Sequence, residues 1–152
     1  MKVRIVWVGR TKNPRISELS LDYVSRIRHF LPLEFSEVKE LRGEGARRIQ
    51  AEGEKLLAAL GPSDCAIALD PGGKSWNSEQ FARFLQKHMA EDSRNLSFVI
   101  GGYGGLSDAL KKRADLLWSL SPLTYTHDLT RVILLEQLYR ALSIIHNLPY
   151  SK

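Results

Sequence analysis

Residues 96–105 read LSFVIGGYGG, a mostly apolar run that passes directly into four glycines around Tyr103. The run Leu96–Ile100 is short, bulky and bounded by glycine, which predicts a buried strand. Glycine has no Cβ, so the loop after the strand can adopt positive φ angles and bring its backbone close to a ligand. A strand that passes through such a loop into a helix predicts an α/β fold. The loop could bind a ligand, or it could be a sharp turn with no ligand.

Strand-like and helix-like segments alternate along the rest of the chain. The strand-like segments are β-branched or alternate apolar with polar residues, and the segments between them place apolar residues three or four positions apart. Alternation of this kind predicts a mostly parallel sheet with helices on both faces. The expected strands are residues 3–8, 33–41, 65–69, 96–100 and 115–119, and the expected helices are residues 16–30, 46–60, 77–89 with a cap at Ser75 or Asn77, 107–113 and 129–147.

The composition describes an ordinary globular chain of 152 residues, 43% hydrophobic and 26% charged. This length is enough for one core and short for two, so a single domain over residues 1–152 is expected. No apolar run reaches membrane-spanning length and no signal peptide pattern precedes the first strand, so we expect a soluble cytoplasmic protein. Cys65 lies in an apolar run and is expected to be a buried structural thiol. The four histidines show no paired ligand spacing, so no metal site is expected.

The net charge of +5 favours a polyanionic partner, although a solvated basic surface would give the same value. What favours the partner is that the basic residues cluster. The clusters are Lys111-Lys112-Arg113, Arg42 with Arg47 and Arg48, and Arg131 with Arg140 on the last helix.

A second glycine-rich turn follows the expected strand at residues 65–69, in Asp70-Pro71-Gly72-Gly73-Lys74. In open α/β sheets ligands bind beyond the carboxyl ends of the strands, so the two glycine-marked strand ends are expected to flank one pocket. The segment Leu120–Tyr125 is a candidate third wall, because its apolar side chains and backbone amides could hold an adenine. The glycine loop does not match the GxGxxG pattern, so a dinucleotide site of the Rossmann type is weakly supported.

The last expected helix carries an apolar segment, Val132–Leu135, with no polar side. A helix that is apolar all round is buried on more than one side, which predicts a homodimer through this helix, or else a core within one chain. Glu136 and Arg140 are spaced to form an ion pair, which competes with Arg140 reaching a substrate. His127, just before the helix, could be a cap or a base.

A set of short motifs is spread over essentially the whole chain. These motifs are Leu69-Asp70 with Gly72, Ile100-Gly101-Gly102 with Gly104, Leu106-Ser107, Leu120-Ser121, Leu123-Thr124, His127, Arg131, Glu136–Ala141 and Asn147–Tyr150. Taken together, they resemble the RlmH (YbeA-type) family of ribosomal RNA methyltransferases. The resemblance implies a SPOUT-type α/β fold with a C-terminal trefoil knot and an obligate homodimer. It also implies methyl transfer from S-adenosylmethionine to N3 of a pseudouridine in helix 69 of 23S rRNA, on the assembled ribosome.

The resemblance also assigns roles to individual residues. The cofactor-binding residues would be Leu69, Gly101, Leu120, Ser121, Pro122, Leu123, Thr124 and Tyr125. On the substrate side, the candidates are Arg131, Arg140 and Lys152 for rRNA phosphates, Tyr150 for stacking on the target base, and His127 for accepting the N3 proton. The chain departs from the family at Asp128, Thr130 and Ser151, the last of which stands where members commonly have histidine.

Two other classes of function account for fewer features of the sequence. A non-catalytic RNA-binding protein of the ribosome would explain the charge but would leave both glycine-marked strand ends without a role. A nucleotide-dependent oxidoreductase or kinase would need an acidic ribose ligand or a phosphate-binding lysine motif, and the sequence has neither.

Overall fold

The computed structural model describes residues 1–151, with side chains through Tyr150, and consists of one five-stranded sheet flanked by helices. The strands lie in the order β2-β1-β4-β3-β5, and every pair of neighbours is parallel. Within the described residues, no helix is both long and apolar enough to cross a membrane. The elements are β1 (Val3–Val8), α1 (Pro14–Ile27), β2 (Leu33–Val38), α2 (Gly45–Ala59), β3 (Cys65–Ser75), α3 (Ser78–Glu91), β4 (Leu96–Ile100), α4 (Asp108–Arg113), β5 (Leu116–Ser119), α5 (His127–Ile145) and a 3-10 turn at Pro149–Ser151.

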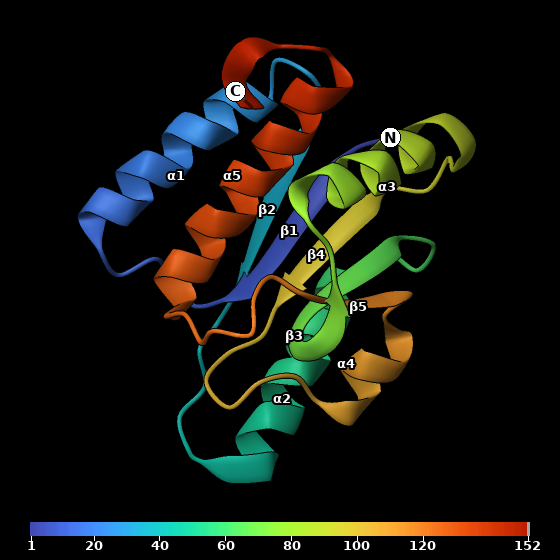
Figure 1. Ribbon diagram of the computed structural model, residues 1–152. Helices are drawn as coiled ribbons and strands as arrows, with labels where there is room; N and C mark the ends of the chain where they lie inside the picture. The colour runs from blue at the N-terminus through green and yellow to red at the C-terminus, as the bar shows by residue number, and fades with distance from the viewer. Residues whose placement is uncertain (152) are drawn as a thin grey trace.

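Helices cover both faces of the sheet, as the sequence predicted (Figure 1). Successive residues of a strand point to opposite faces. On β4, Phe98 therefore packs in the larger core under α1, α3 and α5, whereas Val99 packs in the smaller core under α2 and α4. The run 96–100 is buried along its whole length because β4 lies between β1 and β3 and both of its faces are covered.

The expected turn at residues 70–74 is instead part of β3, and this prediction was wrong. Leu69 and Lys74 both pair with Trp118 of β5, so residues 70–73 bulge out and the chain then returns to the same neighbour. Gly73 makes the return possible, because a Cβ at this position would lie 2.5 Å from the carbonyl carbon of Leu117. The bulge carries Asp70 and Pro71 outward at the carboxyl edge of the sheet.

The apolar segment of α5 is mostly buried within its own chain. Helix α5 packs between α1 and α3, so it is covered by the sheet below and by a helix on each side (Figure 1). Val132, Leu134 and Leu135 are consequently at most 8% exposed. The expectation that this segment is buried between subunits was wrong for these three residues. Among the half-exposed residues of α5, a narrower stripe is made of Ile133, Glu136, Gln137, Arg140 and Ile144.

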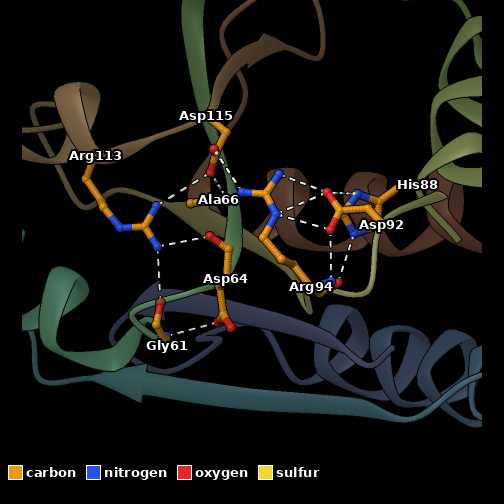
Figure 2. A network of polar contacts seen from close by, with 8 residues as sticks. All are labelled: Gly61, Asp64, Ala66, His88, Asp92, Arg94, Arg113 and Asp115. Atoms are coloured by element: carbon orange, nitrogen blue, oxygen red, sulfur yellow. Dashed lines mark hydrogen bonds and ion pairs between the residues drawn. The ribbon is translucent and has the colours of Figure 1, made fainter.

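A network of polar contacts fixes the amino-terminal edge of the sheet (Figure 2). Asp64, just before β3, accepts a hydrogen bond of 2.7 Å from the buried hydroxyl of Ser97 on β4. Asp115, just before β5, accepts the backbone N–H of Ala66 at 2.8 Å and also pairs with Arg94 at 3.3 Å. These contacts hold the starts of β3, β4 and β5 together. The loops that follow the strands lie at the opposite edge of the sheet, away from this network.

Candidate functional site

A cavity of about 510 Å³ opens at the carboxyl edge of the sheet. Three segments line it: the end of β3 with its bulge, the glycine loop after β4, and the loop that joins β5 to α5. This volume is in the range of small-molecule and cofactor sites. All the residues expected to bind the cofactor line the cavity except Pro122, which is exposed.

The glycine loop folds tightly back on itself. Gly104 and Gly105 both have φ angles of +94°, and the N–H of Gly105 donates to the carbonyl of Gly102 at 3.1 Å. A Cβ at Gly101 would lie 2.8 Å from Cδ2 of Leu106 and 3.1 Å from the carbonyl oxygen of Gly105. Glycine is therefore needed at position 101 for the loop's own closure, in addition to any approach by a ligand.

The loop from β5 to α5 is shaped by local hydrogen bonds. The hydroxyl of Ser119 donates to the carbonyl of Ser121 at 3.1 Å, and the hydroxyl of Ser121 accepts the N–H of Leu123 at 3.0 Å. Leu123 is 70% exposed at the mouth of the cavity. The hydroxyl of Thr126 then caps α5 by accepting the N–H of Leu129. These hydrogen bonds fix the backbone of the loop, so its apolar side chains are held in place at the cavity, where a flat aromatic ring could pack against them.

His127 lies at the rim of this cavity as the first residue of α5. The next residue, Asp128, accepts the backbone N–H groups of Lys12 and Asn13 at 3.1 and 2.8 Å. Asp128 therefore joins the loop between β1 and α1 to the start of α5, although the sequence singled it out only as a departure from the family pattern.

Arg131 is buried, with 2% of its surface exposed. Its guanidinium donates to the hydroxyl of Thr11 at 3.1 Å and to the carbonyl of Val8, and it lies 4.6 Å from the centre of the Trp7 ring. Burial lowers the pKa of Arg131, and its Nε atom has no hydrogen-bond partner among the described residues. The sequence grouped Arg131 with Arg140 as a basic cluster on the last helix, but Arg131 is buried, and it ties the end of β1 to α5.

Arg140 and Tyr150 lie at the other end of α5. Arg140 pairs with Glu136 at 2.6 Å, so the ion pair indicated by their spacing is present. The Tyr150 hydroxyl donates to Glu136 at 3.0 Å and lies 3.0 Å from the Tyr23 hydroxyl. Burial and these hydrogen bonds raise the pKa of Tyr150. The side chain of Ser151 and all of Lys152 fall outside the described part of the chain.

The expected site residues thus form two groups within one chain. The cavity is lined by residues at the amino-terminal end of α5, and Tyr150 follows its carboxyl-terminal end. The 19 residues of α5 span roughly 28 Å at 1.5 Å per residue. One chain therefore does not bring Tyr150 to its own cavity.

Sequence reasoning missed a second cavity of about 400 Å³, which shares Tyr103 and His127 with the first. Arg10 and Lys12, on the loop after β1, also line it. The signal that could have found this loop is the rule used for the other two, because β1 is parallel to β4 and ends at the same edge. Among residues 1–151, no three His, Cys, Asp or Glu side chains are grouped as a metal site would require.

Solved structures of low sequence identity share this fold. A probable methyltransferase from Bordetella pertussis matches with a TM-score of 0.57 and 16% identity, covering 93% of this chain and 96% of that one. A tRNA (m1G37) methyltransferase from Aquifex aeolicus matches with a TM-score of 0.52 and 14% identity, covering 92% and 70%.

Comparisons of sequence, in contrast, identify the family of this chain. A family model described as "Predicted SPOUT methyltransferase" matches residues 1–151. A protein of Trichlorobacter lovleyi named ribosomal RNA large subunit methyltransferase H is 42% identical, covering 99% of both chains. A protein of the same name from Chromobacterium violaceum is 44% identical, covering 100% of this chain and 99% of the relative. The chain therefore belongs to the SPOUT methyltransferase family and, within it, to the group of ribosomal RNA large subunit methyltransferase H proteins.

Proposed function

We propose that this protein transfers a methyl group from S-adenosylmethionine to N3 of a pseudouridine in helix 69 of 23S rRNA, on the assembled ribosome. One observation carries the proposal. The segments that the sequence indicated for a cofactor meet in one cavity, in a chain that matches rRNA methyltransferases over its full length. The proposal also gives the net charge of +5 a role, since the substrate is a polyanion.

The cavity fits S-adenosylmethionine by its size and by the chemistry of its walls. Leu120, Leu123 and Tyr125 offer apolar contacts for the adenine, and the backbone of the glycine loop is open to the polar groups of the ribose and the amino acid. The bound cofactor supplies an electrophilic methyl group on a sulfonium sulfur. No metal ion is required for this chemistry.

The residues of this chain would contribute mainly by positioning. Holding the target nitrogen in line with the methyl group can supply roughly 7 to 11 kcal/mol of the barrier reduction. N3 must also lose its proton, and His127, at the rim of the cavity, is our candidate to accept it. Arg131 is a positioning residue in this scheme, because it fixes the start of α5, and with it His127, against β1.

A homodimer would join the two groups of site residues. The half-exposed stripe on α5 borders a groove of about 780 Å³ between α3 and α5, lined by Gln137, Arg140 and Ile144 among others. If two copies of α5 packed antiparallel across this stripe, the C-terminal end of one would lie beside the cavity of the other. Arg140 and Tyr150 would then act on substrate held at the partner subunit's cavity.

Three further expectations from the resemblance accompany this proposal. The chain after β5 is expected to be threaded as a trefoil knot, which would lock the third wall of the cavity in place. Lys152 is expected to bind an rRNA phosphate. The protein is expected to work in the cytoplasm, where assembled ribosomes are found.

The proposal is tested with ribosomes from a strain that lacks the corresponding gene. Purified protein with S-adenosylmethionine should produce N3-methylpseudouridine, detected by mass spectrometry of 23S rRNA nucleosides, on whole ribosomes and less well on free rRNA. Isothermal titration calorimetry should show binding of S-adenosylhomocysteine without added metal. A protein that binds ribosomes but neither the cofactor nor its product would instead be the non-catalytic RNA-binding protein.

The tail is tested in the same assay under single-turnover conditions. Deletion of the residues after Asn147, and Tyr150→Ala alone, should leave cofactor affinity unchanged. Loss of one stacking contact should slow methyl transfer roughly 5-fold to 150-fold. Wild-type rates for both variants would remove Tyr150 from the site.

A further inference from the structure

The second cavity lies between the loop after β1 and the start of α5, directly beside the first. Gly102, Tyr103, Thr126 and His127 line both cavities. The two cavities therefore share a wall, and Tyr103 stands in it. A group held in the second cavity would lie next to a group held in the first, where the two cavities adjoin.

Tyr103 is an unusual wall residue because 76% of its surface is exposed. It is the one aromatic residue among the large exposed hydrophobic side chains of the described chain. Its backbone is nevertheless fixed, since Gly102 and Gly105 on either side form a bridge closed by a hydrogen bond of 3.1 Å. An exposed flat ring on a closed loop is a surface on which a nucleic-acid base can stack.

The charges around the second cavity favour an anionic group. Both of its carboxylates already have partners: Asp128 accepts two backbone N–H groups, and Glu40 pairs with Arg48 at 3.0 Å. The guanidinium of Arg131 is buried in the wall, hydrogen-bonded to neutral oxygens, with its Nε unpartnered among the described residues. Arg10 and Lys12 add two more positive side chains to the lining, and the Lys12 ammonium lies 4.0 Å from Glu40. The field in this cavity therefore suits a phosphate.

We propose that the second cavity receives the nucleotide to be methylated, with its base stacked on Tyr103 and its phosphate beside Arg10. This inference rests on the proposed function and adds the substrate subsite to it. Because the two cavities adjoin at these shared residues, the base would lie next to the methyl donor, with His127 at the rim. Tyr103 acts as a positioning residue for the base, and Arg10 contributes affinity for any RNA at this position.

The test compares Tyr103→Ala, Tyr103→Phe and Arg10→Gln with the wild type. Met89→Ala is the matched control, because Met89 is an exposed apolar side chain at the end of α3, outside both cavities. Three quantities are measured: the Kd of S-adenosylhomocysteine by calorimetry, the Kd of undermethylated ribosomes by pelleting with that product bound, and kcat/KM for methylation.

Tyr103→Ala should weaken ribosome binding and lower kcat/KM roughly 5-fold to 150-fold, with the Kd of S-adenosylhomocysteine unchanged. Tyr103→Phe should restore the wild-type values, since stacking needs the ring and not the hydroxyl. Arg10→Gln should weaken ribosome binding and reduce its dependence on salt. Met89→Ala should match the wild type in every measurement.

Wild-type ribosome affinity and kcat/KM in Tyr103→Ala would overturn the inference. So would a weaker S-adenosylhomocysteine affinity that accounts for the whole loss, because Tyr103 would then belong to the cofactor cavity. Failure of Tyr103→Phe to rescue would also reject stacking. If the wild-type protein binds ribosomes but methylates none, the proposed function fails, and the ribosome Kd of Tyr103→Ala still decides the inference.

Discussion

We expect Arg131→Met to slow methyl transfer while changing the free energy of unfolding of this protein only slightly. The substitution keeps most of the side-chain volume but removes a guanidinium that is 2% exposed and has no carboxylate hydrogen-bonded to it. Two hydrogen bonds to a charged group contribute about 1.5 to 3 kcal/mol each, and the contact with Trp7 adds about 2 kcal/mol. Taking an ion out of water costs several kcal/mol in return. The opposing contributions are of similar size.

We therefore expect the free energy of unfolding of Arg131→Met to change by no more than about 2 kcal/mol, because these contributions offset one another. Methyl transfer should fall by about 10-fold to 100-fold, equivalent to about 1.4 to 2.8 kcal/mol in the barrier. The charge is lost from the wall of the second cavity, and the start of α5 is no longer tied to Val8 and Thr11.

The assay for Arg131→Met pairs urea denaturation with single-turnover methylation of ribosomes at saturating cofactor. Arg131→Lys is the control, since it keeps the charge but lacks the planar guanidinium, whose two separate nitrogens bond Thr11 and Val8, and it should recover part of the rate. A loss of stability above about 4 kcal/mol, with activity falling only as the folded fraction falls, would refute the reasoning. Arg131 would then be retained for stability alone.

Three other predictions follow from particular contacts. Gly101→Val should abolish S-adenosylhomocysteine binding in calorimetry while circular dichroism stays native, because its Cβ would lie 2.8 Å from Leu106 and force the loop open; unchanged affinity would remove this loop from the site. Ile144→Glu, on the half-exposed stripe of α5, should give a folded monomer in analytical ultracentrifugation, and a dimer of wild-type strength would place the interface elsewhere. Hydrogen bonds from Arg94 hold the pKa of Asp92 at about 2, below its ordinary value, so the stabilisation is complete above about pH 4 and is lost as the pH falls toward 2. Asp92→Asn should accordingly show a smaller decrease in Tm between pH 5 and pH 3 than the wild type, and an equal decrease would contradict the assignment.

Local sequence patterns predicted the secondary structure closely where the signal is itself local. Helix α3 begins after Asn77 because the side chains of Asn77 and Gln80 each accept the other's backbone N–H. The run 96–100 forms β4 with the bounds that its apolar residues and flanking glycine indicated. Helix α1, in contrast, ends at Ile27 and not at residue 30, and Leu19 is 46% exposed although it is spaced four residues from Tyr23 on the apolar side of the pattern. Periodicity of three to four residues left the exact face of that helix open.

The first cavity was predictable because the rule that indicated it depends on chain direction alone. Parallel strands end at one edge, so loops that follow different strands meet there whatever the strand order. The bulge in β3 was not predictable, because Asp70-Pro71-Gly72-Gly73 is typical of a turn and only pairing with β5, some 45 residues later in the chain, draws Lys74 back into the sheet. That pairing depends on contacts distant in sequence.

By itself, the sequence determined most elements of this protein, its α/β class, its family and the three segments that line the first cavity. These depend on hydrophobic period, on caps and glycines, and on the common direction of parallel strands. Only the tertiary structure decided that Val132, Leu134 and Leu135 are covered by their own chain, that Arg131 is buried, and that Tyr150 lies at the far end of α5 from the cavity. The physical reason is that a pattern shows which face of an element must be buried, whereas the element that covers it is fixed by packing between residues far apart in the sequence.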